Sequence, residues 1–107
     1  MSLFSSFFGP SINELAAQAA ETPGSILVDV RSPDEFRGGH ITGAMNVPLV
    51  ALPANATRRL PNKQAPLFVY CLSGARSAQA CRELARQGYE NVTDMGGINR
   101  WTGPLAQ

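Results

Sequence analysis

LFVYCLSGARS, residues 67–77, places a cysteine where an apolar run stops and an amphipathic helix begins. A short apolar run bounded by turn residues predicts a strand buried on both faces of a parallel sheet, over 67–70. A short loop between such a strand and a helix N-terminus turns backbone N–H groups inward, where they add to the positive end of the helix dipole. With Arg76 beside it, we expect Cys71 to ionise more readily than a free thiol and to act as a nucleophile.

The other interpretation of Cys71 is a small buried hydrophobe that ends a strand. The residues around it favour the nucleophile. Gly74 permits backbone angles that other residues resist, and Arg76 and Ser77 fall in the first helical turn. The cysteine also follows a strand of a predicted parallel sheet, at the carboxyl edge where such folds bind ligands.

The chain has the size and charge of one ordinary globular domain. It has 107 residues, enough for a modest single core, and a formal net charge of +1. No run of basic residues is typical of a surface that binds DNA or a membrane, so we expect no nucleic-acid partner and no membrane association. Any anion site must therefore be local.

Cysteine and histidine are too few for a disulfide framework or a convincing metal site. The two cysteines are ten positions apart and there is one histidine, whereas structural zinc takes four such ligands. No basic residue precedes Arg31, and no apolar stretch is long enough to span a bilayer. We expect no metal, and a reducing, cytoplasmic location.

Residues 1–10 are predicted to form an apolar extension, separate from a domain over 11–107. Within the extension, four apolar side chains fall at helical spacing on one face: Leu3, Phe4, Phe7 and Phe8. The extension has no cationic residue to favour anionic lipid, so we expect it to pack on its own domain or at a dimer contact.

Strand and helix signals alternate along the domain. A capping box at Ser11 starts a helix that ends before Pro23, and a second capped helix begins at Ser32. Apolar runs predict strands over 26–30, 45–48, 67–70 and 91–95. A long helix ends at Gly88 and a short one covers 98–101. This alternation favours an α/β fold with a parallel sheet.

Cys81 and Asp29 are interpreted as structural. Cys81 falls on the apolar face of the helix after residue 77, where burial keeps a thiol protonated, so we favour this over a redox role. Asp29 lies inside an apolar strand and must find hydrogen-bond donors or a cationic partner.

Three segments, in this order, resemble those of single-domain rhodaneses, a sulfurtransferase family. The first spans Val28-Asp29-Val30-Arg31 to Val47-Pro48, the second is the loop 70–77, and the third is Asp94-Met95-Gly96-Gly97-Ile98 with Trp101. The resemblance covers most of the chain. It implies a single rhodanese-like domain in which helices flank both faces of a five-stranded parallel sheet.

The resemblance also implies a chemistry. In this family the cysteine takes a sulfane sulfur from a donor such as thiosulfate, becomes a persulfide and passes the sulfur to cyanide or a thiol. A thiolate that attacks a sulfur bonded to a good leaving group needs no general base and no cofactor. The backbone amides expected to cradle the sulfur belong to Leu72, Ser73, Gly74, Ala75 and Arg76.

Neighbouring side chains receive supporting roles. Arg76 is expected to steer an anionic donor, and Ser77 is expected to cap the helix in preference to assisting by its hydroxyl. Asp29 and Arg31 are interpreted as architecture beneath the loop, together with Glu35 and His40. A Cys71–His40 dyad of the protease type lacks any other supporting residue.

Two other functions remain open. Protein tyrosine phosphatases also use a cysteine, an amide-lined loop and an arginine, but their loop is longer than the four residues between Cys71 and Arg76. A shorter ring disfavours phosphate, which needs a wider cradle than one sulfur. A persulfide carrier or interaction module in a sulfur relay, acting on a partner protein without turnover, shares every feature of the sulfurtransferase.

Overall fold

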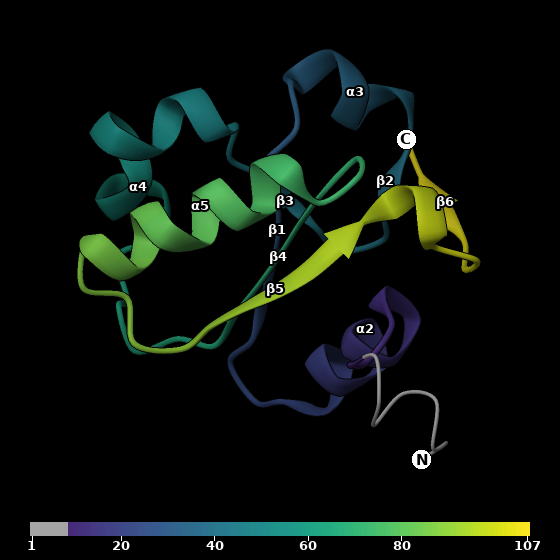
Figure 1. Cartoon of the computed structure of the whole chain (residues 1–107), viewed down its shortest axis with the longest axis horizontal. Helices are drawn as coiled ribbons and strands as arrows, with labels where there is room; N and C mark the ends of the chain where they lie inside the picture. The colour runs from purple at the N-terminus through teal and green to yellow at the C-terminus, as the bar shows by residue number, and fades with distance from the viewer. Residues whose placement is uncertain (1–8) are drawn as a thin grey trace.

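A parallel β-sheet forms the centre of the computed structural model, which describes residues 9–107. Its strands are β1 (Ile26–Asp29), β3 (Met45–Asn46), β4 (Leu67–Cys71) and β5 (Val92–Gly97). They lie in the order β3-β1-β4-β5, and each neighbouring pair runs parallel (Figure 1). The predicted α/β class is confirmed.

The parallel sheet has four strands, so the expected count of five is wrong. The fifth strand rested on the family resemblance alone, whereas the apolar runs in the sequence supply the four strands observed. The two remaining strands, β2 (His40–Ile41) and β6 (Leu105–Ala106), pair antiparallel with each other and form a separate small sheet. Each has two residues, and neither pairs with a strand of the central sheet.

Strand β4 holds the middle of the sheet. It pairs with β1 on one edge and with β5 on the other, and all five of its residues are buried. A strand that is covered on both faces needs apolar side chains in succession, which its sequence supplies. The carboxyl end of β4 is therefore held by pairing on both sides.

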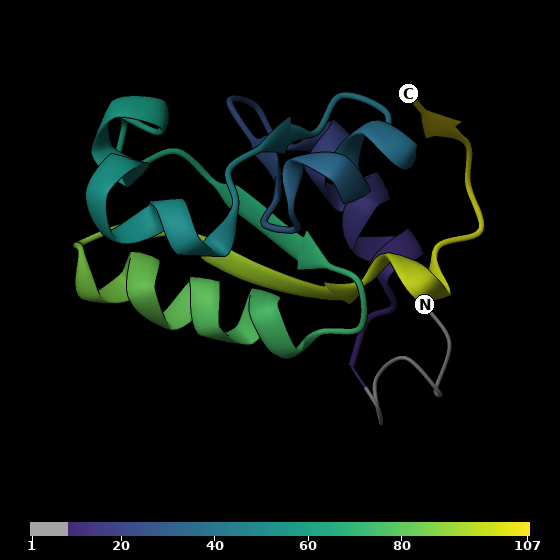
Figure 2. The ribbon, with the colours of Figure 1, turned by 90° about the horizontal axis from the view of Figure 1, so that it is seen from above.

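Helices α4 (Leu52–Arg59) and α5 (Ala75–Arg86) cover one face of the sheet (Figure 1). The chain leaves β4, turns, and returns along the sheet through α5 (Figure 2). The buried residues between these layers include Val28, Leu52, Leu67, Val69 and Leu84. Cys81 packs against the same cluster, as its place on the apolar face of α5 predicts.

Helix α2 (Ile12–Glu21) covers the opposite face, so helices on both faces are confirmed (Figure 1). The predicted capping box starts this helix: Ser11 Oγ accepts from Glu14 N, and a Glu14 carboxylate oxygen accepts from Ser11 N. Its buried side chains pack with those of β4 and β5 in a second cluster: Ile12, Leu15, Ala19, Phe68, Tyr70 and Met95.

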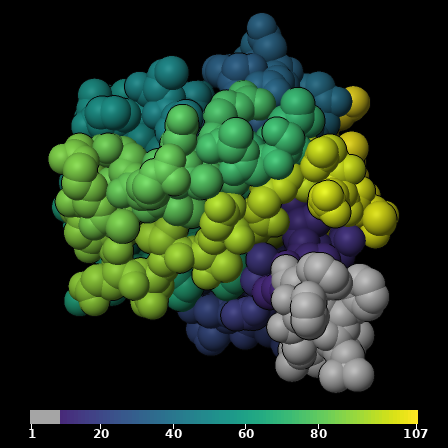
Figure 3. Space-filling view, viewed as in Figure 1, coloured from purple at the N-terminus to yellow at the C-terminus, as the bar shows by residue number. Residues whose placement is uncertain are grey.

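Three short elements complete the fold: α3 (Pro33–Gly38), η1 (Leu49–Ala51) and η2 (Ile98–Arg100). A second capping box, made by Ser32 and Glu35, starts α3 with Pro33 as its first residue, as predicted. Asn99 of η2 donates its backbone N–H to the Leu72 carbonyl in the connection between β4 and α5, and Glu35 of α3 pairs with Arg76 at the start of α5. That connection reaches the surface beside the C-terminal segment, where green meets yellow in Figure 3.

Within residues 9–107, none of the helices has the length and apolar character needed to cross a bilayer. The apolar side chains predicted to share one face of the N-terminal extension belong to residues 3–8, which lie outside the described residues.

We predict that Leu84→Ala lowers the free energy of unfolding by about 2–5 kcal/mol, because Leu84 is fully buried between α5 and the sheet. Leu105→Ala, at a side chain that is 56% exposed, should change it by less than about 0.5 kcal/mol. Urea denaturation measures both, and equal losses in the two variants would contradict the packing described.

Candidate active site

Cys71 ends β4 at the carboxyl edge of the sheet. Its residue is 1% exposed, and its register partner on β5 is Gly97. The chain then forms a tight loop over residues 72–74, and α5 begins at Ala75. The structure thus brings the predicted cysteine, loop and helix together at the edge where parallel sheets bind ligands.

Gly74 closes the loop back onto the sulfur. Its φ of 110° lies in the left-handed region, which glycine adopts without the clash that a Cβ causes. In this conformation the Gly74 N–H donates to Cys71 Sγ at 3.0 Å. Of the amides predicted from Leu72 to Arg76, this one has a direct hydrogen bond to the sulfur, and the full cradle stays a prediction.

Ser77 does not cap the helix, so that prediction is wrong. The N-cap residue is Gly74, which makes no side-chain capping bond, and Ser77 lies inside the first turn. Its buried hydroxyl donates to the Gly74 carbonyl at 3.0 Å. Ser77 lies in the first turn, as the sequence analysis expects, but the left-handed turn at Gly74 makes Ala75 the first residue of α5 and gives the capping position to Gly74.

Hydrogen bonds hold the pKa of the Cys71 thiol below its ordinary value. Burial raises this pKa, but the Ser77 hydroxyl and the backbone amides of Ser77, Gly74 and Ser73 outweigh it. A hydroxyl carries one proton and rotates freely, so Ser77 can turn from the Gly74 carbonyl toward a thiolate. The thiolate is therefore stabilised mainly by neutral donors.

Gly97 allows the loop to approach β5. A Cβ at this position would lie 2.4 Å from the Leu72 carbonyl oxygen and 2.7 Å from Ser73 Cα. The same Leu72 carbonyl accepts a hydrogen bond from Asn99 N at 3.1 Å, which ties the loop to η2. Glycine at 97 thus lets the backbone of the cysteine loop rest directly on the neighbouring strand.

Arg76 forms a two-pronged ion pair with Glu35 of α3. Its two terminal nitrogens donate to the two carboxylate oxygens at 2.7 and 3.0 Å. The bond from Arg76 lowers the pKa of Glu35 to about 2, with further help from the backbone of Ser32. The positive charge expected to steer a donor is therefore balanced by a carboxylate within the site.

Asp29 and Arg31 form a buried ion pair beneath this edge of the sheet. Their residues are 0% and 5% exposed, and Arg31 Nη2 donates to Asp29 Oδ2 at 2.8 Å. Arg31 Nη2 also donates to the Gly39 carbonyl, and Asn46 Nδ2 donates to the carbonyls of both charged residues. The pair is bonded to itself and to nearby backbone, and the architectural role assigned to it stays a prediction.

The His40 side chain interacts with Phe36, a residue of its own segment. Its ring stacks on Phe36 with centroids 3.6 Å apart, and its Nδ1 lies 2.8 Å from the Phe36 carbonyl oxygen.

Cys81 is partly buried on α5, and burial raises the pKa of its thiol to about 12. The two cysteines thus have opposite pKa shifts.

Two open pockets flank the loop. One, of about 380 Å³, includes Leu72 together with Arg31, Glu35, Trp101 and Leu105. The other, of about 520 Å³, includes Ser73 and Arg100. In the part of the chain covering 9–107, no group of three or more His, Cys, Asp or Glu residues is placed to hold a metal ion.

The rhodanese-like domain family matches residues 11–104, nearly the whole chain. The chain belongs to this family. The cysteine loop at the end of β4, closed by a left-handed glycine, lies within the matched region.

Curated relatives agree with the family match. A sulfurtransferase of Allochromatium vinosum is 40% identical over 88 residues, which cover 81% of this rhodanese-like chain and 80% of the relative. Thiosulfate sulfurtransferase PspE of Escherichia coli is 35% identical over 71 residues, 66% of this chain and 68% of PspE. The uncharacterized protein YqhL of Bacillus subtilis is 38% identical over 80 residues, and those residues span 74% of this chain and 62% of YqhL.

A solved structure supports the fold independently. It is described as a rhodanese with anions from E. coli and superposes with a TM-score of 0.71 at 31% identity. The alignment covers 78% of this chain and 98% of the other. The rhodanese-like architecture is thus shared over most of both molecules.

The sequence reasoning missed two features of the site. It placed Glu35 in the architecture beneath the loop but did not identify it as the partner of Arg76. Few acidic residues precede the loop at this edge of the sheet, so the candidates for such a partner were few. It also assigned no role to Arg100, which lines the larger pocket beside Ser73. The available signal was position, because Arg100 closely follows Gly97, the last residue of β5.

We predict that Ser77→Ala raises the pKa of Cys71, because the hydroxyl is among the groups that lower it. At a pH below this pKa, the thiolate fraction and hence the rate of alkylation by iodoacetamide should fall. The measurement is the alkylation rate of Cys71 against pH in a Cys81→Ala background. Profiles that superimpose with and without Ser77 would show that the hydroxyl does not reach the thiolate.

Proposed function

We propose that this rhodanese-like chain is a sulfurtransferase that moves a sulfane sulfur from a donor such as thiosulfate, through a persulfide on Cys71, to cyanide or a thiol. The observation that carries the proposal is the Cys71 sulfur itself, which accepts the Gly74 amide at 3.0 Å and has a lowered pKa. We assign this activity to residues 11–107 and regard residues 1–10 as an extension.

The first half-reaction forms the persulfide. The Cys71 thiolate attacks the outer sulfur of thiosulfate, a new S–S bond forms, the old S–S bond breaks, and sulfite leaves with its electron pair. No proton transfer is required, so His40 is not needed as a general base in this step. The Gly74 N–H and the Ser77 hydroxyl are placed to stabilise charge on the sulfur atoms.

The second half-reaction returns the thiolate. A thiolate or cyanide attacks the outer sulfur of the persulfide, the bond to Cys71 Sγ breaks, and the electron pair remains on Sγ. The same donors that lower the pKa of Cys71 make it a good leaving group in this step. A single site therefore serves both halves of the cycle.

Thiosulfate as the donor is part of the proposal. The support is the similarity to PspE and to an E. coli rhodanese solved with anions. The balanced Arg76–Glu35 pair leaves little net charge in the loop itself, so the amide donors would have to hold an anionic donor.

A persulfide relay to another protein is a second candidate. Leu72, directly after the cysteine, is 44% exposed, and Leu105 on the same pocket is 56% exposed. Exposed apolar side chains beside a reactive group suit contact with a partner protein. A reducing, cytoplasmic compartment is part of the same proposal, and two free cysteines are consistent with it.

The phosphatase reading is less favourable than either sulfur-transfer function. The Gly74 N–H lies against the Cys71 sulfur at 3.0 Å, so this short loop closes on one sulfur atom. A phosphoryl group needs donors for three equatorial oxygens. The family match also favours sulfur chemistry.

We predict that thiosulfate adds the mass of one sulfur atom to the intact protein and that cyanide or a thiol removes it. Mass spectrometry with peptide mapping should place the sulfur on Cys71. Cys71→Ala should abolish the gain while leaving folding nearly intact, and Cys81→Ala should leave it largely unchanged. A gain of sulfur in Cys71→Ala would contradict the mechanism. If several sulfur donors all fail to add sulfur to the wild type, the loop serves binding and not sulfur transfer.

We predict that Arg76→Gln lowers kcat/KM about tenfold for thiosulfate and much less for a neutral organic trisulfide. The substitution leaves the Glu35 carboxylate unbalanced, and this carboxylate repels an anionic donor. The double variant Glu35→Gln/Arg76→Gln is the matched control and should recover most of the lost preference. Equal losses for charged and neutral donors would refute the electrostatic role of the pair.

A further inference from the structure

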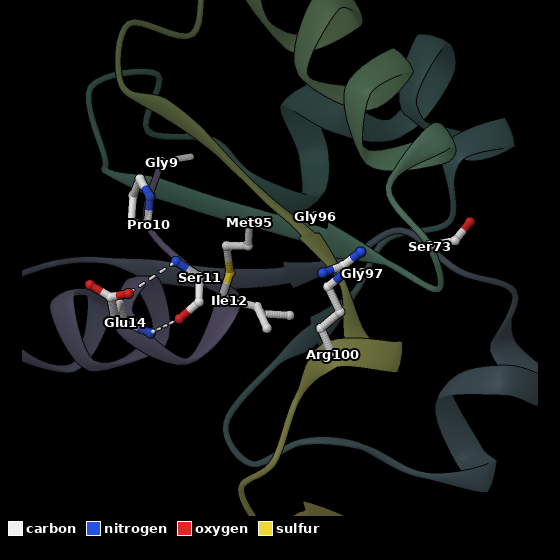
Figure 4. A pocket seen from close by; sticks show the side chains of 10 residues that line it. All are labelled: Gly9, Pro10, Ser11, Ile12, Glu14, Ser73, Met95, Gly96, Gly97 and Arg100. Atoms are coloured by element: carbon white, nitrogen blue, oxygen red, sulfur yellow. Dashed lines mark hydrogen bonds between the residues drawn. The ribbon is translucent and has the colours of Figure 1, made fainter. Parts of the chain in front are cut away.

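The larger pocket beside the cysteine loop opens where residues 1–8 join the rest of the chain. Its volume is about 520 Å³, which falls in the range of small-molecule sites. Gly9 and Pro10, the first residues that the structure describes, form one wall. Figure 4 shows Arg100 on the other side of the pocket and Met95 between the two walls. The pocket is thus directly accessible to the segment that precedes Gly9.

The floor of the pocket is apolar. Ile12 of α2 and Met95 of β5 are 3% and 4% exposed and belong to the cluster that fills the space between α2 and the sheet. Beside them the pocket is lined by Gly96 and Gly97, which have no side chain to fill it. Methionine sulfur makes favourable contacts with the edges of aromatic rings. The floor therefore offers a surface on which an aromatic side chain can pack.

The far wall adds a cation. Arg100 belongs to η2 and is exposed. A guanidinium group within about 6 Å of the centre of an aromatic ring is attracted to the face of that ring. With Met95 on the floor and Arg100 on the wall, the pocket provides two kinds of contact to a phenyl ring.

The segment that precedes Gly9 supplies phenyl rings. Residues 1–9 have no charged side chain, and their large apolar side chains fall at helical spacing on one face: Leu3, Phe4, Phe7 and Phe8. Aromatic side chains have large apolar surfaces, so their burial stabilises a fold more than that of most other residues. The two rings nearest to the pocket belong to Phe8 and Phe7, which directly precede Gly9.

Gly9 turns the backbone at the pocket wall. Its φ of 83° lies in the left-handed region, and Pro10 follows it directly. A left-handed glycine with a proline just after it is a common end of a helix. The helical spacing of residues 3–8 therefore predicts a short helix that ends at Phe8. Ser11 is already the N-cap of α2, and a connection this short places consecutive helices side by side.

We propose that residues 3–8 dock in this pocket of their own chain, with the rings of Phe7 and Phe8 against Met95 and Arg100. The N-terminal extension is then a packed part of the domain, and the pocket is its binding site. This inference goes beyond the proposed function, because it does not depend on sulfur chemistry.

Attachment favours the chain's own segment over the other occupants. A short connection gives the segment an effective concentration in the millimolar range at the pocket, which a second copy in solution reaches only at high protein concentration. A lipid surface would attract the segment through its apolar side chains alone, because residues 1–10 carry no cationic side chain for anionic headgroups.

Met95 itself reports on the pocket. The chain has three methionines, Met1, Met45 and Met95, so labelling of their methyl groups with ¹³C gives three NMR signals. Phe7→Leu and Phe8→Leu keep an apolar side chain but remove the aromatic ring, whose ring current shifts nearby protons. At least one of the two substitutions should move the Met95 methyl signal and remove its contacts to the protons of the lost ring.

Two controls accompany this measurement. Met45 packs against the other core cluster, on the face covered by α4 and α5, so its methyl signal should not move in either variant. Ser6→Ala changes the opposite face of the segment and should leave the Met95 methyl signal in place.

Docking also contributes to stability. Phe7→Ser/Phe8→Ser should lower the Tm by about 4 °C or more, because it removes two buried rings. The matched variant Ser5→Ala/Ser6→Ala, on the opposite face, should shift the Tm by less than about 2 °C. Differential scanning calorimetry of the full chain measures both.

Three results would overturn the proposal. A Met95 methyl signal that is unchanged in both Phe7→Leu and Phe8→Leu would show that the segment does not reach the pocket. A shift that disappears on dilution from millimolar to micromolar protein would assign the pocket to the segment of a second copy. Vesicles of phosphatidylglycerol that bind the wild type but not Phe7→Ser/Phe8→Ser, with the same Met95 signal in both proteins, would assign the segment to a lipid surface.

Discussion

The buried Asp29–Arg31 ion pair is the interaction on which the functional edge of the sheet depends. Taking two charges out of water is costly, and the cost is offset only when every donor and acceptor is satisfied. Here the pair bonds to itself and Arg31 holds the Gly39 carbonyl, while Asn46 binds the backbone of both residues. The Arg31 guanidinium also lies 5.9 Å from the ring centre of Tyr70, whose hydroxyl accepts from Ile41 N. The ion pair thereby ties the end of β1 to Gly39, just before β2, and lies beside Tyr70, the residue that precedes Cys71, while Asn46 of β3 binds the same stretch of backbone.

Around this ion pair, each charged side chain near the loop is paired with one of opposite charge. The Cys71 sulfur is stabilised by neutral donors instead. Asp29 is matched by Arg31 and Glu35 by Arg76, so neither pair places much net charge on the loop. The stabilisation of a thiolate at Cys71 comes from an amide at 3.0 Å and a buried hydroxyl. Such preorganised dipoles act at short range, so they favour charge on one atom without attracting every anion in solution.

The sequence was most informative where the signals are local. Both capping boxes, the buried strand β4 and the amphipathic helix after it could be predicted because each depends on residues within a few positions. The N-cap residue of α5 could not, because it depends on the left-handed φ of Gly74, and the capping role assigned to Ser77 was wrong for the same reason. The partner of Arg76 lies 41 positions away, a contact that only the assembled sheet creates. The strand count failed because it was taken from a resemblance and not from an apolar run.

The near-complete burial of Cys71, at 1% exposed, has a consequence for the protection of its sulfur. Thiolates are the first species on the ladder from sulfenic to sulfonic acid, and their damage depends on access. A second sulfur extends the side chain by about 2 Å, the length of an S–S bond. In the proposed cycle, the sulfur of Cys71 itself would stay buried, and the outer sulfur of the persulfide would lie about 2 Å farther from the backbone. The atom that is transferred would then be the more exposed of the two, and the atom that stays on the protein would be the less exposed to oxidants.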